Sequence, residues 1–168
     1  MKILHLGDLH LGKAVNDFNM IDDQRYILEQ VLTIIQDQGI DALLLAGDIY
    51  DRSVPSEEAV QLLDYFLCRL CEIGIDTFII SGNHDSEERL HFGSRLFETN
   101  HVYISSKYDG TIYKKVCQDE YGKINIYLLP FVKASQVKYF YPEEKIETYE
   151  DAVKASLAHT DIDTSERN

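Results

Sequence analysis

Three short apolar runs near the start of the chain alternate with two segments of helical periodicity. The apolar runs cover residues 3–6, 42–46 and 77–81, and the helical segments cover 20–38 and 55–74. Because strands that alternate with helices pair in parallel through right-handed crossovers, this order predicts an α/β fold around a parallel sheet. The run 42–46 is apolar throughout, which indicates a strand covered on both faces.

The ends of these helices and the later elements are also marked in the sequence. Gly39 stops the first helical pattern, and Ser56 opens the second ahead of two glutamates. Glycine is the usual residue just beyond a helix, and acidic residues stabilise its first turn. Further elements are predicted in order along the chain: a helix over 86–97, a β-hairpin of 111–117 and 123–129, and a helix over 149–158.

Length and charge restrict the class of protein. The 168 residues suffice for one well-cored domain, and the formal net charge is −13. Such acidity argues against a chain held on nucleic acid or an anionic membrane by its own net field. No apolar run is long enough to span a membrane, and three cysteines are too few for a disulfide framework. These features predict a reduced, soluble, cytoplasmic protein.

The charge is unevenly distributed along the chain. Residues 1–100 carry a net charge of −11, whereas residues 101–140 carry +3 and are rich in tyrosine and phenylalanine. Basic groups among aromatics can follow a phosphate backbone and stack on bases. The same composition is typical of β-strands with solvated lysines, and the sequence favours this second interpretation.

Each of the first three predicted strands is followed by a loop of unusual composition. The three loops are Gly7–His10, Gly47–Asp51 and Gly82–Asp85. In an open parallel sheet the ligand site lies beyond the carboxyl ends of the strands, so the three loops should meet at one edge. Each loop alone is more typical of a turn, but their joint occurrence at successive strand ends indicates a site.

The side chains in these loops are suited to hold divalent cations. Asp8 and His10 are two residues apart, so an extended strand end would direct both side chains the same way. Asp48 can bridge two cations through its two oxygens, and Asn83 and His84 offer an amide oxygen and an imidazole. Oxygen and imidazole donors without thiolate favour manganese, magnesium or iron over structural zinc. Two cations about 3.5–4 Å apart would clamp a phosphorus centre for in-line displacement.

Two other motifs do not indicate a site. Gly7–Lys13 has the spacing of a phosphate-binding loop, but Ala14 replaces the required hydroxyl residue and Asp8 would repel phosphates. Cys68 and Cys71 have metal-ligand spacing, yet they lie inside a predicted helix without a second pair.

The ordered set of Asp8-Leu9-His10, Gly47-Asp48 and Gly82–Asp85 resembles the calcineurin-like metallophosphoesterases. The longer segments 7–13, 47–55 and 128–131 resemble, more specifically, the SbcD-type family of nuclease subunits. This resemblance covers essentially the whole chain. The resemblance implies a four-layer α/β/β/α sandwich and a manganese-dependent DNA exonuclease and endonuclease, with magnesium as the alternative metal. It also implies an SMC-like ATPase partner of the SbcC type and a role in DNA repair, recombination and replication.

By the same resemblance, each site residue has an expected role. Asp8, His10 and Asp48 would hold the first metal, and Asp48 and Asn83 the second. His84 would stabilise the transition state or protonate the leaving oxygen. Asp51 is a candidate to orient His84, as a carboxylate behind an imidazole commonly does.

The family pattern continues with a further histidine strand and a Gly-His-x-His loop, and neither occurs in this sequence. We therefore expect residues 1–168 to be the N-terminal part of a nuclease domain, incomplete at the C-terminus and inactive alone. Apolar residues on more than one face of 59–73 fit either a helix buried on several sides within one chain or homodimerisation through this segment and 86–97, and the family resemblance implies the homodimer. The alternatives are a phosphodiesterase or phosphatase for small phosphoesters and a non-catalytic dimerisation or assembly module.

Overall fold

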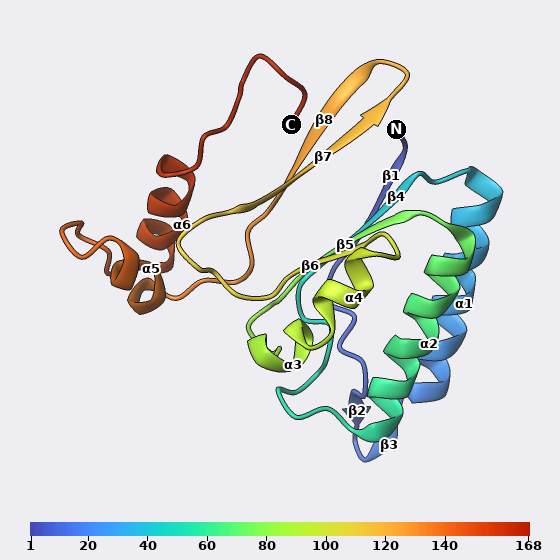
Figure 1. The fold of residues 1–168 in the computed structure, drawn as a ribbon. Helices are drawn as coiled ribbons and strands as arrows, with labels where there is room; N and C mark the ends of the chain where they lie inside the picture. Colours follow the sequence, from blue (N-terminus) through green and yellow to red (C-terminus); the bar gives the residue numbers. More distant parts are fainter.

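The computed structural model describes all residues from 1 to 168 and arranges them in layers (Figure 1). The central element is a four-stranded parallel sheet with the strand order β1-β4-β5-β6. Its strands are β1 (Ile3–Leu6), β4 (Ala42–Ala46), β5 (Asp76–Ile80) and β6 (Val102–Ser105). The predicted α/β fold with a parallel sheet is confirmed, and β6 is a fourth strand that the sequence analysis did not identify.

Two long helices cover one face of this sheet. They are α1 (Ile21–Gln38) and α2 (Glu57–Ile73), which pack side by side in Figure 1. The ends follow the expected chemistry, since Gly39 ends α1 with a left-handed φ of 58° and the Ser56 side chain accepts a hydrogen bond from the Ala59 N–H. Leu43 and Leu45 of β4 point into the resulting core, where both are almost completely buried.

The opposite face of the sheet is covered by a β-hairpin and then by two further helices. The hairpin consists of β7 (Tyr113–Asp119) and β8 (Gly122–Leu128), and the helices are α5 (Ala134–Phe140) and α6 (Tyr149–Ala158). Cys117 and Leu128 of the hairpin pack on Phe78 of the sheet. A separate apolar cluster joins α5 and α6. The layers therefore follow the expected α/β/β/α order, with the hairpin as the second β layer (Figure 1).

The segment expected as one helix over 86–97 is broken, and that prediction was wrong. It forms α3 (Glu87–His91) and α4 (Ser94–Glu98), separated at Gly93, whose φ is 77°. A left-handed residue cannot continue a right-handed helix, so the chain changes direction there. A short hairpin of β2 (Ala14–Val15) and β3 (Phe18–Asn19) also follows the first loop. None of the helices is both long and apolar enough for a membrane crossing.

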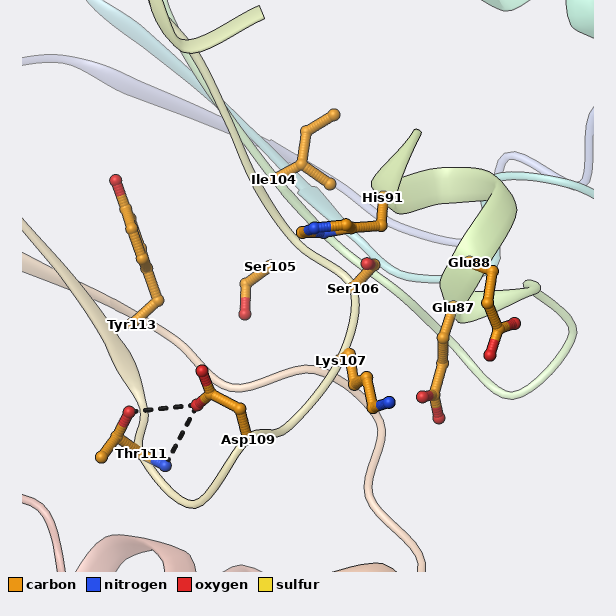
Figure 2. A pocket seen from close by; sticks show the side chains of 10 residues that line it. All are labelled: Glu87, Glu88, His91, Ile104, Ser105, Ser106, Lys107, Asp109, Thr111 and Tyr113. Atoms are coloured by element: carbon orange, nitrogen blue, oxygen red, sulfur yellow. Dashed lines mark hydrogen bonds between the residues drawn. The ribbon is translucent and has the colours of Figure 1, made fainter. Parts of the chain in front are cut away.

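A cavity of about 540 Å³ lies beside α3 and the end of β6 (Figure 2). Its lining is mostly polar and contains none of the residues that the sequence assigned to a metal site. The lining residues are Glu87, Glu88, His91, Ile104, Ser105, Ser106, Lys107, Asp109, Thr111 and Tyr113.

Asp119 joins the hairpin to both ends of the chain. Its carboxylate accepts a hydrogen bond from the Met1 amino group at 2.7 Å and two from the Arg167 guanidinium, at 2.6 and 3.1 Å. The Arg167 carbonyl in turn accepts a hydrogen bond from the Asn125 N–H at 2.9 Å. The Arg167 guanidinium, the amino group and the Tyr121 N–H together hold the pKa of Asp119 well below its ordinary value.

We expect Asp119→Asn to lower the melting temperature at neutral pH, because the substitution removes the charge that pairs with Arg167. Because the pKa of Asp119 is lowered in the folded state, its ion pair contributes fully to the free energy of unfolding above about pH 4. This contribution is lost as the pH falls toward the folded-state pKa. The difference in melting temperature between wild type and variant should therefore shrink on acidification. Thermal unfolding followed by circular dichroism at several pH values measures it. Glu120→Gln, an exposed neighbour without an ion pair, is the control, and an equal pH response in both variants would contradict the assignment.

Candidate metal centre

Main-chain hydrogen bonds beyond the ends of β1 and β4 hold the first two loops together. The Asp8 N–H donates to the Gly47 carbonyl at 3.2 Å, and the His10 N–H donates to the Asp48 carbonyl at 2.9 Å. The Leu11 N–H continues the series to the Ile49 carbonyl at 2.9 Å. The two loops thus extend the parallel pairing of their strands, which fixes the relative positions of the three expected ligands.

The ligands themselves lie on strained backbone. Asp8, His10 and Asp48 have left-handed φ values of 56°, 44° and 47°. Residues other than glycine adopt this region at a cost, and such positions cluster at functional sites. Asp8 and His10 do converge, but the expected reason, an extended strand end, was wrong: β1 ends at Leu6 and both residues lie in the loop.

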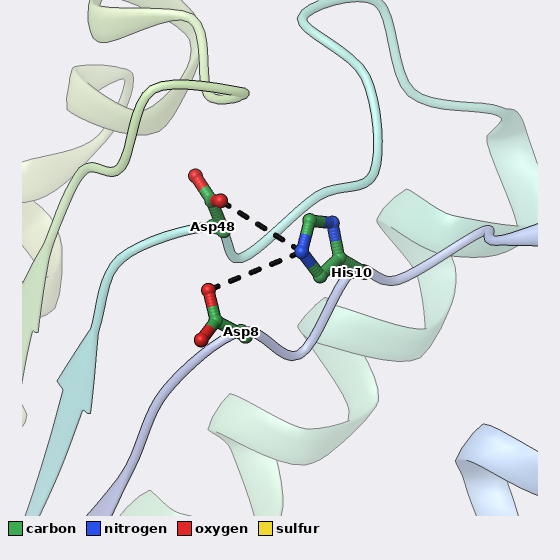
Figure 3. A group of neighbouring side chains, drawn as sticks. All are labelled: Asp8, His10 and Asp48. Carbon is green, nitrogen blue, oxygen red and sulfur yellow. Dashed lines mark ion pairs between the residues drawn. The ribbon is translucent and has the colours of Figure 1, made fainter.

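The side chains of Asp8, His10 and Asp48 form a triangle of donor atoms (Figure 3). His10 Nε2 lies 3.9 Å from Asp8 Oδ1 and 3.7 Å from Asp48 Oδ2, and all three donor atoms are within 4.8 Å of one another. Donors bound to one ion at about 2.1 Å are at most about 4.2 Å apart. The triangle therefore fits a divalent cation after small side-chain rotations, and its oxygen and imidazole donors suit manganese or magnesium.

The third loop brings His84 and Asn83 to the same place. The His84 N–H donates to Asp48 Oδ1 at 3.0 Å, and the His84 ring meets the His10 ring edge-on with centroids 4.9 Å apart. Asn83 lines the same open cleft as Asp8 and Asp48. The structure thus brings three of the four sequence-predicted ligands, Asp8, Asp48 and Asn83, to one cleft, and the fourth, His10, lies beside Asp8 and Asp48.

The orientation of His84 differs in detail from the expectation. Its Nδ1–H donates to the main-chain carbonyl of Asp51 at 2.8 Å, so the carbonyl and not the carboxylate orients the ring. This bond is the main cause of a raised His84 pKa; burial opposes the shift, and the negative charges of Asp48, Asp51 and Asp85 add to it.

The Asp51 carboxylate faces His10 instead. Asp51 Oδ1 is 3.4 Å from His10 Nδ1, on the side of the imidazole opposite the donor triangle. A carboxylate behind a ligating histidine fixes the ring orientation and raises its basicity. Asp51 Oδ2 lies 3.8 Å from the exposed Arg52 guanidinium, so one aspartate contacts the ligand histidine and the neighbouring cation.

Two residues that the sequence analysis did not assign to the site hold its loops. The Asp85 carboxylate accepts hydrogen bonds from the N–H groups of Gly82, Ile49 and Tyr50 at 2.8, 3.1 and 2.9 Å. Gln24 of α1 bonds to the first loop through both ends of its amide, donating to the His10 carbonyl at 2.8 Å and accepting from Gly12. Asp85 lies within a quoted motif, but no local signal marks Gln24.

Gly82 leaves the space that Asp48 occupies. A Cβ atom added at Gly82 would lie 2.0 Å from Asp48 Oδ1 and 2.3 Å from the Asp48 nitrogen. Real Cβ atoms do not approach so closely, so any side chain there would displace the ligand. Only glycine allows the third loop to approach the second this closely.

The fold and the donor set define a class of protein. Residues 1–163 match the sequence profile of the calcineurin-like phosphoesterases, and the chain belongs to this family, whose members use divalent metals. The chain is 37% identical over 171 residues to a protein of Staphylococcus saprophyticus that is named as a subunit of the nuclease SbcCD, covering 100% of this chain and 44% of that protein. A protein of the same name from Staphylococcus epidermidis is 39% identical over 158 residues, covering 94% of this chain and 41% of the relative. The chain therefore spans less than half the length of these relatives.

We expect Gly82→Ala to weaken Mn²⁺ binding by at least about tenfold, because the added methyl group displaces Asp48. Isothermal titration calorimetry measures the affinity, and circular dichroism checks the fold. Gly7→Ala is the matched control, since its Cβ would meet nothing closer than the Ala46 carbonyl oxygen at 3.5 Å and its φ is not left-handed. Equal Mn²⁺ affinity in the two variants would show that the position of Asp48 does not control the site.

Proposed function

We propose that this chain carries the catalytic metal centre of a DNA nuclease subunit. The proposed activities are double-strand exonuclease cleavage from the 3′ to the 5′ end and single-strand endonuclease cleavage. The observation that carries the proposal is the triangle of Asp8, His10 and Asp48 with His84 beside it, in a chain whose similarity to proteins named as nuclease subunits extends over its whole length.

The proposed centre holds two divalent cations, with Mn²⁺ as the preferred metal and Mg²⁺ as the alternative. Asp8, His10 and Asp48 would hold one cation, and Asp48 with Asn83 would hold the other. Bound cations would supply a Lewis acid for the phosphoryl oxygens and lower the pKa of the attacking water. Asp51 Oδ1 lies 3.4 Å from His10 Nδ1, which has no hydrogen-bond partner, and this proximity supports a role for Asp51 as a positioning residue for the first cation.

His84 is proposed to act on the scissile phosphodiester. Because Nδ1–H donates to the Asp51 carbonyl, the ring is held with Nε2 as its free nitrogen. The raised pKa favours the protonated ring, which can stabilise a developing negative charge or give a proton to the leaving oxygen. His84 is exposed next to the cleft residue Asn83, so a substrate can reach its ring.

The proposed partners are DNA and an SMC-like ATPase of the SbcC type, in the cytoplasm, with roles in DNA repair, recombination and replication. The names of both Staphylococcus relatives, which place them in the SbcCD nuclease, support this part of the proposal. The described residues provide four expected metal donors, fewer than two cations need. We therefore expect the 168-residue chain to bind Mn²⁺ weakly and to cleave DNA only when further donors are supplied.

The proposed function can be tested with a chimera. In this chimera the chain replaces the matching segment of the Staphylococcus saprophyticus relative. We expect Mn²⁺-dependent cleavage of linear duplex DNA, reduced about 100-fold or more by His84→Ala, because the ring no longer assists the leaving oxygen. His84→Gln should rescue little, since an amide cannot donate a proton as an imidazolium does.

The outcomes of this experiment separate the competing functions. A chimera that hydrolyses a chromogenic phosphodiester but not DNA would favour a small-molecule phosphodiesterase or phosphatase. Cleavage of DNA by the 168-residue chain alone, lost with His84→Ala, would contradict its expected inactivity. A chimera that is folded but inactive on both substrates would favour a non-catalytic assembly module.

Homodimerisation is a second proposed property, and a specific surface supports it. An apolar groove of about 250 Å³ lies between α2 and the α3–α4 segment. Around it the side chains of Val60, Phe92 and Leu96 are 45%, 85% and 74% exposed, an unusual density of large apolar groups in water. A second copy of the chain could bury them.

We expect the wild-type chain to be dimeric at about tens of micromolar and Phe92→Ser/Leu96→Ser to be monomeric, because the substitutions remove the apolar area that a dimer would bury. Light scattering coupled to size-exclusion chromatography measures the mass. Tyr121→Ser, an equally exposed aromatic on the hairpin turn, is the control. A wild-type chain that is monomeric at this concentration would contradict the proposal.

A further inference from the structure

The cleft that contains the candidate metal ligands has a second wall of different chemistry. The cleft measures about 350 Å³, and one wall is formed by Asp8, Asp48 and Asn83. The opposite wall is apolar and aromatic, and its residues are Leu129, Pro130, Phe131, Val132, Tyr149 and Val153. Metal ions and phosphate groups gain nothing from an apolar wall, so this wall points to a further part of the substrate.

Phe131 is held firmly at the edge of the metal centre. Its N–H donates to the Ser81 carbonyl at 2.9 Å, directly before the loop that carries Asn83 and His84. The next residue, Val132, is buried in the cluster under α5 and α6. The main chain therefore fixes the point from which the Phe131 ring extends into the cleft.

Tyr149 extends this wall from the start of α6. Its ring centroid is 5.5 Å from that of Phe131, with the ring planes tilted by 42°. Thr148 caps the helix by accepting from the Asp151 N–H, while the Asp151 carboxylate accepts from the Thr148 N–H. This reciprocal capping fixes the backbone at Tyr149, yet its side chain remains 61% exposed. A large aromatic surface thus extends from an ordered backbone and is left uncovered.

We propose that Phe131 and Tyr149 form a stacking platform for the nucleobase next to the phosphate bound at the metal centre. This inference rests on the proposed nuclease function and specifies its substrate as a nucleotide. Every base has a flat π-face that stacks on aromatic side chains without regard to sequence. No lysine or arginine lines the cleft. Binding at the platform would therefore depend on stacking, whose contribution to the binding free energy is not screened by salt.

The platform is tested by comparing two ligands that differ only by the nucleoside. Binding of 2-aminopurine deoxyribonucleoside 5′-monophosphate and of inorganic phosphate is measured by calorimetry on the 168-residue chain in saturating Mn²⁺. We expect Tyr149→Ala to weaken nucleotide binding by about tenfold and to leave phosphate binding unchanged. Tyr149→Phe should retain the wild-type affinity, and quenching of 2-aminopurine fluorescence in Mg²⁺ should disappear with Tyr149→Ala.

The chain offers a matched control for this experiment. Tyr139 of α5 is 80% exposed and pairs with Phe140 at a centroid distance of 5.3 Å, but it lies outside the cleft. Tyr139→Ala should therefore bind both ligands as the wild type does. Phe131→Leu keeps an apolar side chain but removes the aromatic ring. This variant should weaken nucleotide binding without changing phosphate binding.

Each remaining outcome overturns a defined part of the proposal. Equal loss of nucleotide and phosphate binding in Tyr149→Ala would mean that Tyr149 only supports the structure, and no loss of either would mean that the base does not contact it. A wild-type chain that binds phosphate and nucleotide equally well would contradict the platform alone. A wild-type chain that shows no Mn²⁺-dependent phosphate binding would contradict the proposed metal centre, and the platform with it.

Discussion

The hydrogen bonds to the Asp85 carboxylate hold the metal-binding edge of this molecule together. Ile49 is fully buried and Tyr50 nearly so, and their N–H groups, turned away from the sheet pairing, would lack partners without this carboxylate. Because the same carboxylate also accepts the Gly82 N–H, it joins the loops after β4 and β5. Burial, followed by the negative charges of Asp85 and Asp64, raises the pKa of the Tyr50 hydroxyl to about 12.

The sequence was sufficient to predict three of the four strands of the parallel sheet and the edge at which their loops meet, because these depend on local periodicity and on the geometry of parallel sheets. It was not sufficient for contacts between distant residues, such as the amide of Gln24 on the His10 loop. The assignment of Asp51 to His84 failed in detail because a sequence does not reveal which of two polar groups, carbonyl or carboxylate, turns toward a ring. The break at Gly93 did have a local signal, since glycine disfavours a helix interior.

The acidic composition becomes easier to interpret once the side chains are placed. Part of the net charge of −13 lies in Asp8 and Asp48, the carboxylates of the candidate metal centre, so the charge count alone does not exclude an anionic substrate. The basic and aromatic stretch 101–140 pairs internally, with Lys115 Nζ 4.1 Å from the Tyr103 ring centroid and Lys114 Nζ 5.4 Å from that of Tyr127. These pairs support the interpretation of its strands as ordinary β-structure, whereas Phe131, near the end of the same stretch, lines the cleft.

The cleft lies between two separately packed parts of the chain, and this has a consequence for specificity. The candidate metal ligands belong to the loops of the parallel sheet, whereas Phe131 and Tyr149 belong to the segment packed around α5 and α6. A main-chain bond, from the Phe131 N–H to the Ser81 carbonyl, joins the two parts at the cleft. Because that bond does not depend on the side chains, the aromatic wall can change in sequence without displacing the donors. In the proposed arrangement the sheet edge would hold the metals and the apolar wall would select the phosphoester, so the two roles would belong to separate parts of the chain.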